Sequence, residues 1–165
     1  MKTMGAGVML MAVLTCAAWP AAADDVRQEK NLSLGLAADA AAAAVQFCQG
    51  KGWLVSVAVV DRAGQLKALD RADGAGPHTL DSSQRKAYTA ASMRGATSAL
   101  AEMVQKNPGA ANLSQIQGLL LLGGGVPIKV GDEVIGAIGV GGAPGGQLDE
   151  QCADAGINKI RDRLK

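Results

Sequence analysis

This sequence is poor in histidine and in net charge. Its single histidine, His78, excludes a zinc site that needs two histidines. Lys and Arg number 16 and Asp and Glu number 15, so no excess charge favours nucleic acid or an anionic membrane as a partner. Its three cysteines are not spaced as a tetrahedral metal cluster. Neither nucleic acid nor a zinc cluster is therefore expected.

Residues 1–23 have the pattern of an export signal. Lys2 precedes an apolar stretch over residues 4–18, and three alanines lie directly before Asp24. The stretch is too short to span a bilayer, and no basic cluster follows it. We therefore predict a cleaved signal peptide, no membrane anchor, and a location in the periplasm or outside the cell. A retained anchor and lipidation at Cys16 are the alternatives.

Residues 24–165 suit one hydrophobic core and are too few for two ordinary domains. Apolar spacing and turn residues predict the order α-β-β-α-α-β-β-β-α. Helices are expected from Ser33 to near Gly50, from about Thr79 to Arg94, over residues 98–105, and after residue 146. Strands are expected over residues 53–60, 65–71, 119–122, 126–130 and 134–140. Because strand-helix-strand alternation is missing, we expect an α+β fold with a mainly antiparallel sheet and helices packed on it.

Two cysteines remain after the predicted cleavage, one in the first helix and one in the last. Cys48 ends an apolar stripe that also contains Leu34, Ala38, Ala41 and Val45. Cys152 lies at the edge of a stripe made of Ala153, Ile157, Ile160 and Leu164. A bridge between them would close a loop of about a hundred residues and stabilise the fold by about 4 to 5 kcal/mol. Two buried free thiols are the alternative, and the sequence leaves both open.

Two segments could carry chemistry. The second helix has one polar face beside His78, which is either a solvated face or a pocket wall, formed by Ser82, Lys86, Thr89 and Met93. The glycine-rich loop over residues 141–146 precedes the last helix and either binds an anion through its N–H groups or only connects two elements. A lone histidine such as His78 is either a solvated loop residue or one axial ligand of a haem.

Five motifs, in order along nearly the whole mature chain, resemble the GlcG/HbpS family of haem-binding proteins. The same domain is found at the C-terminal end of some corrinoid adenosyltransferases. The motifs are residues 57–61, residues 73–79 with 83–90, residues 124–128, residues 136–146, and residues 149–157. Gly141 departs from the family, which usually has serine there.

The resemblance implies a profilin-like fold, an antiparallel sheet with helices on both faces. The first and last helices would share one face and the middle helices the other, which would bring Cys48 and Cys152 to the same side. It also implies assembly into dimers or larger homo-oligomers, and haem as the cofactor.

With this resemblance, His78 becomes the expected axial ligand of the haem iron. The alternatives on the neighbouring helix are Thr89, Tyr88 and Met93, and the cations expected to reach the haem propionates are Lys86, Arg85 and Arg71. Few aromatic rings remain in the mature chain, so the porphyrin would lie against aliphatic surface.

We therefore expect an exported haem-binding protein that acts as a carrier, scavenger or sensor accessory rather than as a catalyst. One alternative is an enzyme or auxiliary subunit acting on a small carboxylic acid. In that case the loop over residues 142–146 would hold the carboxylate and Lys86 would act as acid or base. A purely structural oligomer is the third hypothesis.

Overall fold

The structure is a computed structural model that describes residues 26–165. The predicted signal peptide and its cleavage site lie outside the described residues. The helices are α1 (Leu34–Gln49), α2 (His78–Met93), α3 (Thr97–Lys106) and α4 (Gly146–Ile160), with 3-10 segments η1 (Pro108–Gln115) and η2 (Arg161–Arg163). The strands are β1 (Ser56–Asp61), β2 (Leu66–Arg71), β3 (Gly125–Val130) and β4 (Glu133–Gly141).

The four strands form one antiparallel sheet in the order β2-β1-β4-β3. The central strand β1 is buried along its whole length because it has a strand on each side and helices on both faces. Pro127 lies in β3, an edge strand, where the missing N–H of proline does not break a ladder on both sides. The predicted α+β fold with an antiparallel sheet is confirmed.

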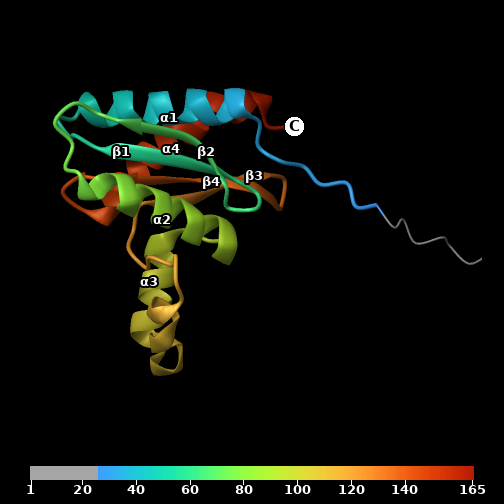
Figure 1. The fold of residues 1–165 in the computed structure, drawn as a ribbon, viewed down its shortest axis with the longest axis vertical. Helices are drawn as coiled ribbons and strands as arrows, with labels where there is room; N and C mark the ends of the chain where they lie inside the picture. Colours follow the sequence, from blue (N-terminus) through green and yellow to red (C-terminus); the bar gives the residue numbers. More distant parts are fainter. Residues whose placement is uncertain (1–25) are drawn as a thin grey trace, which may run out of the picture.

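Helices cover both faces of the sheet (Figure 1). Alternate residues of β1 divide between two cores: Val57 and Val59 pack with α1 and α4, whereas Ala58 and Val60 pack with α2. The α2 side is unusually close-packed at Gly139 of β4, where an added Cβ would lie 2.1 Å from the Ser83 carbonyl oxygen. Glycine therefore lets the backbone of α2 rest directly on the sheet.

Two details of the predicted core are wrong. In α1, Leu34 is 62% exposed and Ala38 is exposed, and the buried stripe is instead Ala37, Ala40, Ala41, Ala44 and Cys48. Alanine fills so much of this helix that apolar spacing could not choose its inner face. The predicted strand over residues 119–122 is a loop, although Leu119 is buried. Its backbone bonds to side chains, because Leu120 N–H donates to Thr89 and the Leu119 carbonyl accepts from Arg85.

A disulfide joins α1 to α4. Cys48 and Cys152 are bonded with their Cα atoms 5.7 Å apart, and they are separated by 104 positions in the sequence. Both residues are fully buried. The bridge left open by the sequence is thus present, and it ties together the two helices of one face, as the family resemblance implied.

Helix α3 and the adjoining η1 project from the body of the domain as an arm (Figure 1). Thr97 is the one buried residue of α3, and η1 has none. Large apolar side chains are exposed on and beside this arm, among them Met103, Ile116 and Leu122. Within residues 26–165, no helix has the length and apolarity that crossing a membrane requires.

Candidate functional site

Helix α2 separates the predicted site residues onto opposite faces. Lys86 and Thr89 are buried against the sheet, with 2% and 0% of their surface exposed. His78, Arg85 and Tyr88 follow one another at spacings of seven and three, so they share the outer face of the helix. His78 and Tyr88 are exposed there, and Arg85 is half-buried. Only this outer face is open to a ligand.

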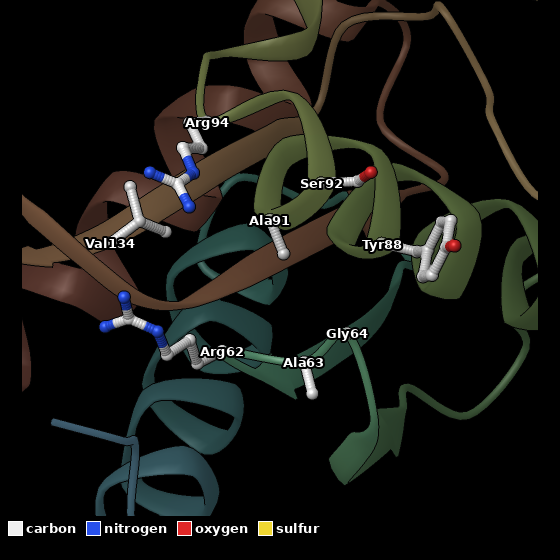
Figure 2. A pocket seen from close by; sticks show the side chains of 8 residues that line it. All are labelled: Arg62, Ala63, Gly64, Tyr88, Ala91, Ser92, Arg94 and Val134. Atoms are coloured by element: carbon white, nitrogen blue, oxygen red, sulfur yellow. The ribbon is translucent and has the colours of Figure 1, made fainter. Parts of the chain in front are cut away.

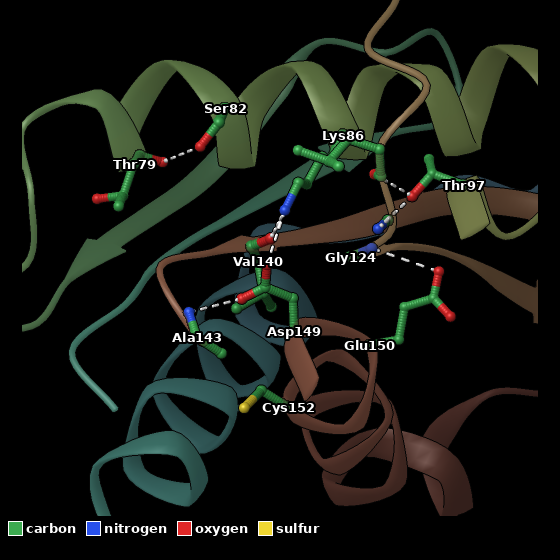
Figure 3. A network of polar contacts seen from close by, with 12 residues as sticks. Thr79, Ser82, Lys86, Thr97, Gly124, Val140, Ala143, Asp149, Glu150 and Cys152 are labelled. Carbon is green, nitrogen blue, oxygen red and sulfur yellow. Dashed lines mark hydrogen bonds and ion pairs between the residues drawn. The ribbon is translucent and has the colours of Figure 1, made fainter. Parts of the chain in front are cut away.

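The inner face of α2 is fastened to β4 and α4 by Lys86 (Figure 3). Its Nζ donates to Asp149 Oδ2 at 2.7 Å and to the Val140 carbonyl oxygen at 2.9 Å. The other oxygen of Asp149, Oδ1, accepts from the N–H of Ala143 at 3.0 Å. Burial raises the pKa of Asp149 above its ordinary 3.8, although the hydrogen bond and charge of Lys86 lower it. This network joins three elements and keeps the Lys86 ammonium inside the protein.

The glycine-rich loop before α4 already holds a carboxylate. The sequence left open whether this loop binds an anion or only connects two elements, and in the structure Ala143 N–H donates to the side chain of Asp149 from the first turn of α4. Gly123 approaches the end of the loop so closely that a Cβ on Gly146 would lie 2.8 Å from the Gly123 Cα. The N–H group of Ala143 is thus occupied by a carboxylate of the protein itself.

A second carboxylate, that of Glu150, fixes the base of the arm (Figure 3). Its Oε1 accepts from the N–H of Ser98 at 3.0 Å and of Gly124 at 3.3 Å, and its Oε2 accepts from the Ser98 hydroxyl at 2.8 Å. Thr97 completes the base by donating to the Leu122 carbonyl and accepting from Gly125 N–H, both at 2.8 Å. Every buried side-chain nitrogen and oxygen among residues 26–165 has a hydrogen-bond partner.

The remaining predicted residues take structural or exposed positions. Thr89 Oγ1 donates to the Arg85 carbonyl and accepts from Leu120 N–H, each at 2.8 Å, so both of its hydrogen-bonding roles are occupied. Arg71 Nε donates to the Ala75 carbonyl at 3.0 Å and thereby shapes the loop before α2. Met93 is half-buried at the end of the helix.

Tyr88 is held between two glycines on the outer face. An added Cβ at Gly64 would lie 2.8 Å from one edge of the ring, and one at Gly118 would lie 3.2 Å from the opposite edge. Both glycines have positive φ, at 77° and 89°. The side chain is 37% exposed, and its hydroxyl has no hydrogen bond within residues 26–165. Tyr88 is therefore fixed in position while its oxygen is left free.

Two hollows meet at Tyr88. The first, about 240 Å³, is called here the arginine hollow and is lined by Arg62, Ala63, Gly64, Tyr88, Ala91, Ser92, Arg94 and Val134 (Figure 2). The second, about 330 Å³, includes Arg85, Asp81 and Gly118 and shares Gly64 and Tyr88 with the first. Arg85 Nη2 donates to the Leu119 carbonyl at 2.8 Å, and its Nη1 lies 3.6 Å from Asp81. Tyr88 thus lies between two hollows, each of which contains arginine side chains.

The structure separates the two exposed donors that suit a haem iron. His78 is the first residue of α2 and Tyr88 lies ten positions later, a rise of about 15 Å along an α-helix. One iron atom can therefore be bound by one of them and not by both from the same chain. Arg62 and Arg94, which our sequence analysis did not single out, line the arginine hollow at the end opposite Tyr88 (Figure 2). Their meeting depends on a tertiary contact between the β1–β2 turn and the end of α2, for which no sequence signal exists.

The fold and this site define an α+β domain in which the buried polar side chains of residues 26–165 are paired and the outer face of α2 is open. A family model described as "Haem degrading protein HbpS-like" matches residues 32–158. The chain therefore belongs to the HbpS-like family, and the resemblance seen in the sequence is confirmed.

Individual relatives agree with this assignment. Protein GlcG of Escherichia coli K12 is 42% identical over 109 residues, which cover 66% of this chain and 80% of GlcG. The crystal structure of a double mutant of Streptomyces reticuli HbpS is 45% identical, has a TM-score of 0.78, and is matched over 86% of this chain and 97% of that one. The crystal structure of a PduOC–heme complex is 26% identical with a TM-score of 0.70, over 79% of this chain and 95% of that one. The family and these structures support a haem-related function.

Proposed function

We propose that the chain is an exported haem-binding protein that acts as a carrier, scavenger or sensor accessory. The observation that carries this proposal is the outer face of α2, which exposes an imidazole and a phenol beside arginine side chains. Histidine and tyrosine are both axial ligands of protein-bound haem. The similarity to a structure described as a haem complex supports the same cofactor.

The residues present fit a porphyrin on this face. Haem supplies an iron centre with free axial positions and two propionates. His78 or Tyr88 would bind the iron, and Arg85 lies in the hollow next to Tyr88 to pair with a propionate. Exposed aliphatic side chains lie on the same side of the sheet, because Leu66 and Leu69 of β2 pair with Val60 and Ala58 and so face the α2 side. Lys86 and Thr89 are engaged inside the protein and are not assigned to the haem.

Two further features support export and assembly. A buried disulfide is typical of proteins that mature in an oxidising compartment such as the periplasm or the cell exterior. Met103, Ile116 and Leu122 are exposed on and beside the projecting arm, and burying such side chains against another copy is the ordinary driving force for a homo-oligomer. We propose that the arm contributes to a dimer or larger assembly.

The alternative hypothesis, an enzyme or auxiliary subunit acting on a small carboxylic acid, needed Lys86 and the glycine-rich loop to be available to a substrate. Lys86 is paired with Asp149, and the loop that was to hold the substrate carboxylate binds Asp149 instead.

Haem degradation, which the family description names, is the second candidate function. It would show as loss of the Soret band and release of iron after haem has bound, with an oxidant supplied.

Haemin titration combined with gel filtration tests the proposal. Residues 24–165 should give a saturable shift of the Soret band and elute above the mass of one chain. An unchanged haemin spectrum at every ratio of protein to haemin would refute haem binding. Elution as a monomer with and without haemin would refute the assembly.

A further inference from the structure

The arginine hollow contains guanidinium N–H groups without a partner among the described residues, near the side chains of Ala63, Ala91 and Val134. Arg94 is exposed and has no acidic partner within residues 26–165. Arg62 pairs through Nε with Glu29 at 3.2 Å and through Nη1 with Glu133, which leaves its Nη2 without a partner in the described chain. Figure 2 shows the two guanidinium groups on either side of the Val134 end of the hollow, with Tyr88 at the other end.

Arg94 stands in a backbone conformation that disfavours it. Its φ of 56° makes it the one non-glycine residue with positive φ among residues 26–165. Helices that end in this left-handed conformation usually have glycine there, because a side chain costs about 1 kcal/mol or more. A cation near a helix C-terminus recovers part of that cost through the helix dipole. Glycine at this position would give the more stable fold. A residue that is kept in a strained conformation is typical of a ligand-binding position.

We propose that the arginine hollow binds the carboxylate of a small organic acid with a flat apolar body. The carboxylate would lie between Arg94 and Arg62, where a guanidinium can donate two parallel hydrogen bonds. The body would lie on Ala91 and Gly64 and reach the ring of Tyr88. A volume of about 240 Å³ suits an acid the size of one aromatic ring or the edge of a larger molecule.

Two kinds of molecule could supply this carboxylate: a free organic acid, or haem through one of its propionates. The haem source rests on the function proposed above, whereas the free acid does not.

The variant Arg94→Gly removes both the backbone strain at position 94 and the cation. It therefore separates the effect on ligand binding from the effect on stability. It should unfold at the same temperature as the wild type or higher, because glycine suits a φ of 56°. Arg161→Gln is the matched control, since Arg161 is exposed in η2 and is not among the residues that line the hollow.

The first experimental arm uses benzoate and its neutral analogue benzamide. Tyr88 is the one tyrosine of the sequence, so its ring signals in an NMR titration report on the hollow without ambiguity. Benzoate should shift these signals in the wild type and in Arg161→Gln, and should bind Arg94→Gly about tenfold more weakly or worse. Benzamide should leave them unshifted. Equal shifts with benzamide, or equal benzoate binding by Arg94→Gly, would remove the free acid as a ligand.

The second arm uses haemin and haemin dimethyl ester, whose propionates carry no charge. If the hollow takes a propionate, Arg94→Gly should weaken haemin binding about tenfold and leave binding of the ester unchanged. If the wild type binds benzoate but no haemin, the proposed haem-binding function is refuted, and the proposal that the hollow binds a carboxylate stands. Binding of both benzoate and haemin that is indifferent to Arg94→Gly, or absence of binding to either, would overturn the proposal for the hollow.

Discussion

Lys86 Nζ and Asp149 Oδ2 lie 2.7 Å apart in the interior, with 3% and 4% of the two side chains exposed. A buried ion pair is costly to desolvate, and removing one partner leaves an uncompensated charge inside the protein. Because this pair joins α2 to α4, it fixes the helix whose outer face carries the candidate site.

Lys86→Met should destabilise the fold by about 3 to 5 kcal/mol, since Asp149 would remain buried without its cation. The double variant Lys86→Met with Asp149→Leu should be more stable than this single variant. Urea unfolding measures both, and Lys129→Met on the exposed surface of β3 is the control. A double variant as unstable as the sum of its singles would show that the two residues act independently.

The disulfide gives a chemical prediction. Exported protein should show no reactive thiol after denaturation alone, and two after denaturation and reduction, because Cys48 and Cys152 are bonded. Loss of the bridge in the variant with both residues changed to alanine should lower the free energy of unfolding by about 4 to 5 kcal/mol in the chain-entropy model. Thiol counting with and without reductant checks the first point. Two thiols in the unreduced, denatured protein would contradict the bridge.

Export predicts the N-terminus of the mature chain. The three alanines before Asp24 suit a signal peptidase, so protein recovered from the cell envelope should begin at or near Asp24. N-terminal sequencing or intact mass measures this directly. Exported soluble protein that still begins at Met1 would rule out cleavage.

The sequence predicted elements whose signals are local. The bounds of α2 agree to within a residue or two because Gly76-Pro77 precedes it and Gly95 follows it. The strand expected over residues 119–122 failed because an apolar run shows burial without showing what its backbone bonds to. Arg85 and Thr89 supply those bonds from a distant part of the sequence.

The candidate site was harder to predict than the fold. The spacing of the polar residues of α2 predicted a solvated face or a pocket wall. In the structure, Lys86 and Thr89 are instead buried and hydrogen-bonded to Asp149 and Leu120. Sequence spacing shows which residues share a helix face, but it cannot show which face meets the sheet when both contain polar side chains. Tyr88 gained its importance only from the tertiary approach of Gly64 and Gly118.

The most direct test of haem binding on the outer face of α2 is a haemin titration of the double variant His78→Ala with Tyr88→Phe beside the wild type. These substitutions remove both exposed donors of that face and keep the ring that packs between the glycines. The wild type should show a saturable Soret shift, and the double variant should show a changed spectrum and weaker binding because the axial bond is lost. The single variant that reproduces the change identifies the ligand. A double variant with the spectrum and affinity of the wild type would contradict a haem site on this face.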